Sequence, residues 1–337
     1  MKQKTHMAKN ILLWVDDKPS ERKSRIGRLC KVLGLIPQDI CLNTQEGGSW
    51  FETLRNFEDE SVALVIVDQY LSNKSTIEPF SAGSSLCSVL REKFIDVPIV
   101  GISAAARADI PESLLDEYTA FYELEWLLDA SEELKAMLKG FESIREMGKK
   151  QKRCSMLKLL NAPPICSDYL NKIIPLEFMS PDLTRKSISF YKWCRDVLFC
   201  FQGVLLDSAA IAASIGLEES SFLKEVSGEL ECCEYAGIFA RKDRKFYWRD
   251  VAYQRLALLA NDTGDIKLSH YGEILCGGTK CLATCPICHK KYTEVLAHEE
   301  NRLTGSRRRA AHYRCVVEAN LPRPALFDPV YILKGGA

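Results

Sequence analysis

The sequence lacks the features that would place the protein in a membrane or, by composition alone, on nucleic acid. It contains no run of the roughly 18 apolar residues that a membrane-spanning helix needs. Its 45 basic residues balance its 45 acidic ones, so no overall field attracts polyanions. The N-terminal residues are polar and basic, and the apolar run at residues 11–15 ends at two aspartates, which makes a poor signal peptide. We therefore expect no membrane partner.

The cysteines also argue against a secreted, disulfide-bonded protein. Fourteen of them are scattered over 337 residues, and several, such as Cys30, Cys87 and Cys194, lie within apolar stretches. Buried free thiols are common in the reduced cytosol, and a disulfide scaffold of this length is unusual. We expect a cytoplasmic protein. Its length and its 47% of hydrophobic residues suit two or three globular domains.

The N-terminal part of the chain alternates between strand and helix patterns. Residues 11–15, 62–67 and 97–102 are short continuous apolar runs, as buried parallel strands require. Helical stripes of apolar residues lie between and after them. Weaker strand patterns at residues 40–43 and 121–124 bring the number of such units to five, which predicts an α/β domain with a doubly wound, five-stranded parallel sheet.

Reactive side chains follow three of these predicted strands. Asp16 and Asp17 end the first strand, Asp68 ends the strongest one, and Ser103 ends the fourth. The carboxyl ends of the strands border the binding crevice of such sheets. Three carboxylates there repel one another unless a hard cation joins them, and Mg²⁺ prefers oxygen ligands. With the metal bound, Asp68 can act as a nucleophile toward phosphorus.

These motifs resemble the response-regulator receiver family. The resemblance rests on Trp14-Val-Asp-Asp17, Val65-Ile-Val-Asp68, Val100-Gly-Ile-Ser103 and the helix that begins near Ala82-Gly83. It implies Mg²⁺ at Asp16, Asp17 and Asp68, phosphorylation at Asp68, a switch through Ser103, and a sensor kinase or other protein as partner. The family places a lysine after the fifth strand, whereas this chain reads Phe121-Tyr-Glu-Leu-Glu-Trp126. A working phospho-switch and a degenerate docking domain both remain open.

A metal site is predicted near the C-terminus. Cys285-Pro-Ile-Cys288 and His312-Tyr-Arg-Cys315 are two pairs with metal-ligand spacing. Four nitrogen and sulfur ligands with no open position form a structural Zn²⁺ site. The pattern resembles a treble-clef or zinc-ribbon type of finger, and four unrelated buried side chains are the plain alternative. Further ligand candidates are Cys276, Cys281, His289 and His298.

The middle of the chain is predicted to be mainly helical. Residues 211–217 and 220–235 predict two helices, and residues 238–249 predict a β-hairpin, an order that resembles a winged helix. The possible contacts with phosphate or nucleic acid are Arg241, Lys242, Arg244, Lys245, Arg307, Arg308 and Arg309. The second helix carries one lysine against four glutamates, however, and phosphate repels acidic helices. This favours protein binding slightly over DNA binding.

Together these patterns predict four segments. They are a receiver-like domain at 9–146, a basic linker at 147–182, a winged-helix-like domain at 183–262 and a zinc-binding module at 263–337. We expect a non-enzymatic signalling protein, phosphorylatable at Asp68, whose output is DNA or protein binding. The alternative is a non-catalytic adaptor or scaffold, with a degenerate receiver, that acts in a multi-protein assembly.

Overall fold

The computed structural model divides the chain into two compact units. The first contains Met1–Cys154 and Ser180–Lys192, and the second contains Ser155–Met179 and Trp193–Ala337. The structure describes residues 10–17, 19–41, 61–71, 82–150, 156–179, 186–200, 203–291, 295–299 and 308–319. The segment near residues 50–57, where Trp50, Leu54 and Phe57 have the spacing of a short helix, lies outside this part of the chain. Part of the predicted linker belongs to the second unit, and the finer domain boundaries stay a prediction.

The first unit is built on five parallel strands in the order β2-β1-β3-β4-β5. The strands are β1 Ile11–Asp16, β2 Ile36–Cys41, β3 Val62–Asp68, β4 Ile99–Ser103 and β5 Ala120–Glu123. This is the flavodoxin-like order, which opens a crevice at the carboxyl ends of β1 and β3. The prediction of a doubly wound, five-stranded parallel sheet is confirmed.

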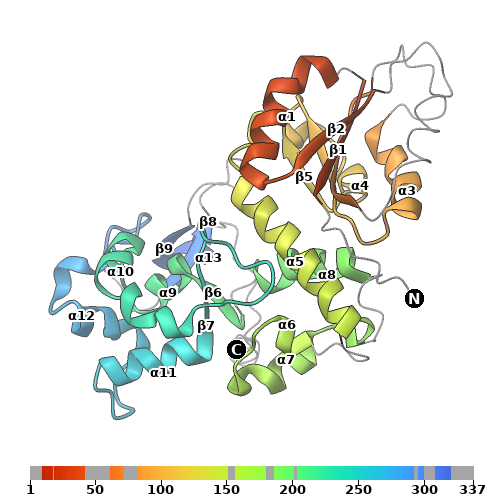
Figure 1. Cartoon of the computed structure of the whole chain (residues 1–337). Coiled ribbons are helices and arrows are strands. Elements are labelled where there is room, and N and C mark those ends of the chain that lie inside the picture. The colour runs from red at the N-terminus through yellow and green to blue at the C-terminus, as the bar shows by residue number, and fades with distance from the viewer. Residues whose placement is uncertain are drawn as a thin grey trace. The chain divides into compact units, whose positions relative to one another are not determined.

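Helices cover both faces of this sheet (Figure 1). They are α1 Pro19–Leu33, α3 Gly83–Lys93, α4 Glu112–Leu115 and α5 Ser131–Lys150, with a 3-10 helix at Arg107–Asp109. Leu13 and Val65 belong to the same buried cluster as Leu86 of α3. Side chains alternate along a strand, so the equally buried Trp14 and Ile66 point to the opposite face, on which α1 packs against α5.

The second unit is mainly helical. Its helices are α6 Met156–Leu159, α7 Ser167–Ile173, α9 Ser208–Ser214, α10 Glu219–Glu225, α11 Arg249–Leu259, α12 Tyr271–Leu275 and α13 Tyr313–Glu318, and α8 Ser187–Trp193 ends at its border. Shorter turns of helix span Pro164–Cys166, Leu176–Met179, Cys194–Leu198, Ser227–Cys233, Leu268–His270 and Thr279–Cys281. Two antiparallel pairs join β6 Leu205–Asp207 to β7 Phe246–Trp248, and β8 Val295–Glu299 to β9 Arg308–His312. None of the helices in the described ranges has the length and apolarity to cross a membrane.

Two details predicted for the middle of the chain are wrong. The helix expected at 220–235 is broken, because α10 ends at Glu225 and a 3-10 helix begins at Ser227, whose hydroxyl bonds the Leu223 carbonyl at 2.7 Å. Such side-chain bonds to the backbone bend or end helices. The expected hairpin is absent within residues 238–249, because β7 pairs with β6 instead. The winged-helix-like fold is therefore not confirmed.

Candidate functional site

An acidic cluster lies at the carboxyl ends of β1 and β3. Asp16 is the last residue of β1, Asp17 follows it directly, and Asp68 is the last residue of β3. All three are buried, with exposed fractions of 0%, 6% and 2%. Each offers a carboxylate oxygen, and these oxygens lie within 4.8 Å of one another. The structure thus brings together the three carboxylates that the sequence analysis grouped.

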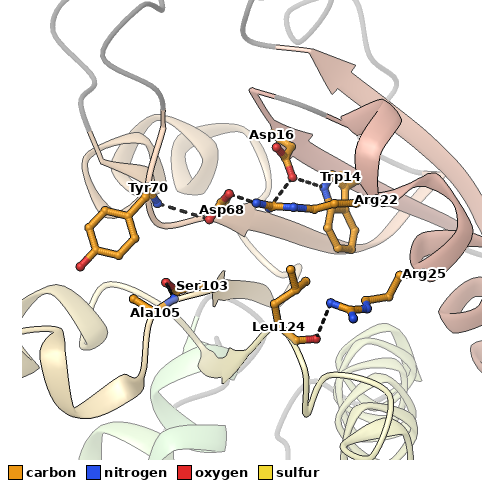
Figure 2. Close-up of polar contacts among 9 residues, drawn as sticks. All are labelled: Trp14, Asp16, Arg22, Arg25, Asp68, Tyr70, Ser103, Ala105 and Leu124. Carbon is orange, nitrogen blue, oxygen red and sulfur yellow. Dashed lines mark hydrogen bonds and ion pairs between the residues drawn. The ribbon is translucent and has the colours of Figure 1, made fainter.

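A cation of the chain itself lies between two of these carboxylates. Nη1 of Arg22, near the start of α1, is 2.6 Å from Oδ2 of Asp16 and 2.6 Å from Oδ2 of Asp68 (Figure 2). Asp16 lies two residues after Trp14 on β1, and Asp68 lies two residues after Ile66 on β3. Because side chains alternate along a strand, both aspartates project toward the same face as Trp14 and Ile66, the face that α1 covers. The indole nitrogen of Trp14 donates to the same Asp16 oxygen at 2.9 Å. Sequence reasoning missed Arg22 entirely.

Burial and charge compete at this cluster. Burial raises the pKa of Asp68 to about 6, whereas the Arg22 guanidinium draws it down. Burial disfavours the charged form of Arg22, but the carboxylates of Asp68 and Asp16 outweigh it and raise the pKa of Arg22 above its ordinary value. Near neutral pH most of Asp68 is therefore ionised, which is the form that a carboxylate nucleophile needs.

Of the two neighbouring strand ends, β4 carries the serine that the receiver resemblance implies, whereas β5 lacks the lysine. Ser103, the last residue of β4, is buried, and its hydroxyl accepts a hydrogen bond from the Ala105 amide at 2.9 Å. At the end of β5, where the family has a lysine, this chain has Glu123 and Leu124. Glu123 accepts a bond from the Arg107 amide at 2.8 Å, so its carboxylate is engaged by the loop after β4.

The backbone next to Asp68 is held from two sides. The amide of Gly83, at the start of α3, donates to the Gln69 carbonyl at 2.9 Å. A Cβ atom at Gly83 would lie only 2.1 Å from the Asp68 carbonyl oxygen, so this close approach requires glycine. The buried hydroxyl of Tyr118 donates to the Gln69 side chain at 2.6 Å.

A second candidate site gathers three thiols and one imidazole. Cys285, Cys288, His312 and Cys315 offer sulfur and nitrogen atoms within 4.8 Å of one another. The first two lie in a tight turn that is closed by a bond from the His289 amide to the Cys285 carbonyl at 2.9 Å. His312 is the last residue of β9, and Cys315 lies at the start of α13. The predicted ligands therefore converge from a turn, a strand end and a helix start.

Local hydrogen bonds orient these ligands. Nδ1 of His312 is 3.1 Å from the Cys288 sulfur and 3.8 Å from the Cys315 sulfur, while Nε2 is 3.3 Å from the Lys291 carbonyl oxygen. A carbonyl only accepts, so Nε2 carries the proton and Nδ1 turns its lone pair toward the sulfur atoms. Burial alone would raise the pKa of the Cys285 thiol, but backbone donors such as the Cys288 amide lower it.

The alternative metal ligands do not join this group. Cys276 and Cys281 hydrogen-bond each other and pack against the main core of the second unit. His289 contributes its backbone to the turn, and the side chain of His298 lies outside the part that the structure describes. Among the described residues, the cysteine–histidine group therefore consists of the four predicted ligands.

Most of the basic residues considered for phosphate contact are paired with acids. The ion pairs are Arg241–Asp243 at 2.6 Å, Arg244–Asp207 at 3.0 Å and Lys245–Glu234. Pairs at the surface are weak, typically about 0–1 kcal/mol, so pairing weakens but does not remove a capacity for phosphate. Lys242 is exposed. Arg307 and the side chains of Arg308 and Arg309 lie outside the described residues.

Comparisons with known proteins reach only part of the chain. No family model and no curated protein matches it. Among solved structures, NtrX from Brucella abortus is 18% identical over 49% of this chain and 34% of its own, with a TM-score of 0.34. The response regulator TrrA from Thermotoga maritima, in complex with Mg²⁺ and BeF, is 18% identical over 38% of this chain and 98% of its own, with a TM-score of 0.29.

A response regulator from Burkholderia pseudomallei, with a phosphorylated aspartic acid, is 13% identical over 53% of this chain and 92% of its own, with a TM-score of 0.29. These identities and TM-scores are too low to carry an argument about chemistry. The strand order and the acidic cluster at the ends of β1 and β3 define the first unit as receiver-like in fold.

Proposed function

We propose that the chain is a receiver-containing signalling protein in which Asp68 accepts a phosphoryl group and the second unit delivers the output by binding DNA or protein. The observation that carries the proposal is the buried convergence of Asp16, Asp17 and Asp68 at the crevice of a flavodoxin-like sheet. Buried carboxylates repel one another, and natural proteins keep such groups where a cation or a reaction uses them.

The donor set fits a magnesium ion. All three candidate ligands are hard carboxylate oxygens close enough to share one ion, which, when bound, would neutralise charge on the phosphoryl oxygens. An oxygen of Asp68 attacks the phosphorus atom and forms an acyl phosphate, and the bond to the donor's leaving group breaks as that group departs with the electron pair. The hydroxyl of Ser103, on the adjacent strand, then donates to a phosphoryl oxygen.

The missing lysine makes this switch weaker than an ordinary one. A charge-assisted hydrogen bond to a phosphoryl oxygen contributes roughly 1.5–3 kcal/mol, and neither Glu123 nor Leu124 can supply it. We therefore expect slower phosphorylation or a shorter-lived acyl phosphate than in a receiver with the lysine. In both cases Asp68 remains the residue that is phosphorylated.

Phosphoryl transfer from a small donor tests the proposal. The full chain is incubated with acetyl phosphate or phosphoramidate and Mg²⁺, and its intact mass is measured. The expected result is one added phosphoryl group that is lost in Asp68→Asn. Asp39→Asn, which removes an exposed carboxylate on β2, is the matched control and should label like the wild type. An unlabelled wild type, or a label that survives in Asp68→Asn, would contradict the proposal.

A second candidate function is that of a non-catalytic adaptor. The observations that favour it are the Arg22 guanidinium between Asp16 and Asp68 and the absence of the lysine after β5. The two functions differ in how output depends on Asp68. A phospho-switch requires partner or DNA binding to change in Asp68→Asn after treatment with a donor, whereas an adaptor binds its partner equally well with either residue.

We also propose that the cysteine–histidine group holds a structural Zn²⁺ ion. Three thiolates and Nδ1 of His312 would supply the four ligands of a closed structural site, and the bond from Nε2 to the Lys291 carbonyl is the kind of support that histidine ligands of zinc receive. The metal would stabilise a small module whose buried cluster, within the described residues, consists of Ala283, Cys285, Ala311 and Val316.

A further inference from the structure

We propose that Arg22 is an internal cation of the acidic cluster, so that a divalent metal ion binds only after the Arg22 guanidinium has left its place between Asp16 and Asp68. This inference rests on the proposed function, because it takes the cluster to be the metal site of a receiver-like domain. The receiver resemblance implies residues that bind the metal ion. The inference adds Arg22, a residue that competes with the metal ion for the same carboxylates.

The geometry of the guanidinium is that of a bridging ion. A single nitrogen, Nη1, contacts one oxygen of Asp16 and one oxygen of Asp68 at the same distance of 2.6 Å. A Mg²⁺ ion would bind carboxylate oxygens at about 2.0–2.1 Å and would need the same space between the two strand ends. The guanidinium occupies Oδ2 of both residues, so a metal ion that takes these two oxygens as ligands has to displace it.

Arg22 is both firmly held and able to leave. Its two carboxylate partners are almost fully buried, with side-chain exposures of 0% and 3%, so each hydrogen bond is charge-assisted and shielded from water. The Arg22 side chain itself is 19% exposed, which gives the guanidinium a route to solvent by rotation about its own side-chain bonds. The metal therefore needs no opening of the sheet.

This arrangement also accounts for a chain without the lysine after β5. A receiver-like acidic crevice is more stable with a positive charge in it when no metal is bound, because two buried carboxylates close together repel each other. Here the charge comes from α1, six residues after Asp16, rather than from the end of β5. The same charge that stabilises the resting cluster then lowers its affinity for a divalent ion.

The test compares the metal affinities of the full-length wild type and three full-length variants by isothermal titration calorimetry with Mn²⁺ and with Mg²⁺. Arg22→Gln should bind at least about tenfold more tightly than the wild type, which corresponds to about 1.4 kcal/mol. Arg25→Gln is the matched control, because it removes the same charge one turn further along α1, where Arg25 donates to the Leu124 carbonyl at 3.1 Å. Its affinity should stay within about twofold of the wild type. Asp68→Asn removes one of the proposed ligands and should no longer bind the metal ion, which would show that the measured binding takes place at this cluster.

A second measurement separates competition from a general effect of charge. With a chelator present, Arg22→Gln should melt at a lower temperature than the wild type, and added Mg²⁺ should raise its melting temperature by more. Equal affinities for wild type and Arg22→Gln, or an equal gain in Arg25→Gln, would overturn the role of Arg22 while leaving the metal site of the proposed function in place. Failure of all the proteins to bind either ion would overturn both.

Discussion

Replacing Gly83 with alanine should displace the backbone that carries Asp68. The first residue of α3 approaches β3 so closely that a Cβ atom would lie 2.1 Å from the Asp68 carbonyl oxygen and 2.9 Å from its carbonyl carbon. These are backbone atoms, so no side-chain rotation relieves the clash. Gly27, on the exposed side of α1, has no atom within 4 Å of an added Cβ and provides the matched control.

The two substitutions should change stability in opposite directions. Added volume in a packed region costs about 1–3 kcal/mol, and Gly83→Ala should fall at the upper end of that range because backbone must move. Gly27→Ala replaces glycine inside a helix and should stabilise the first unit by roughly 0.5–1 kcal/mol. The difference between the two variants is therefore expected to reach about 2–4 kcal/mol.

Hydrogen exchange read by mass spectrometry measures this in the full chain. Peptides that cover β3 report the opening free energy of the first unit alone, which avoids mixing the unfolding of two units. In Gly83→Ala these peptides should exchange roughly 30- to 150-fold faster, which corresponds to about 2–3 kcal/mol, and labelling of Asp68 by acetyl phosphate should fall as well. Exchange that is unchanged in Gly83→Ala, with the expected slowing in Gly27→Ala, would refute the close approach of α3 to Asp68.

Three further predictions concern other parts of the chain. By elemental analysis, the wild type and Cys276→Ser, which lies outside the cysteine–histidine group, should contain zinc, whereas Cys288→Ser should not. Asp207→Ala removes the side chain that caps α9 and should lower the free energy of unfolding by about 1–2 kcal/mol in a urea titration, with most of it recovered in Asp207→Asn. Ile66→Ala, at a fully buried site of β3, should cost about 2–5 kcal/mol by the same assay, whereas Ile95→Ala, 51% exposed, should stay within about 0.5 kcal/mol.

The sheet could be predicted because buried parallel strands leave an unambiguous pattern. Strands β1, β3 and β4 are covered on both faces, so almost every position is apolar and the run ends where the crevice begins. The end of each run therefore predicts, from the sequence alone, that Asp16, Asp68 and Ser103 border the crevice. The cysteine–histidine group was predictable for a similar reason, because the spacing of its two pairs reflects the geometry of a single ion.

What the sequence could not show depends on contacts between distant segments. Strand β6 has only three residues, which are too few to show the alternating apolar pattern of a strand. The sequence therefore gives no sign that β6 pairs with β7, and it predicts a local hairpin instead. In the sequence, Arg22 cannot be distinguished from the other charged residues of the same helix. The side chains of Asp16 and Asp68 project from the face of the sheet that α1 covers. Only this three-dimensional arrangement reveals that the Arg22 guanidinium points inward, toward both carboxylates.

Hydrogen bonds to Gln69 restrict the movement of the backbone next to Asp68. The residue after Asp68 is fastened through its carbonyl to the start of α3 and through its side chain to Tyr118, just before β5. Strand β3 is also hydrogen-bonded to a neighbouring strand on each side. If Asp68 were modified as proposed, a displacement of its backbone would therefore be transmitted through Gln69 to α3 and to the segment before β5.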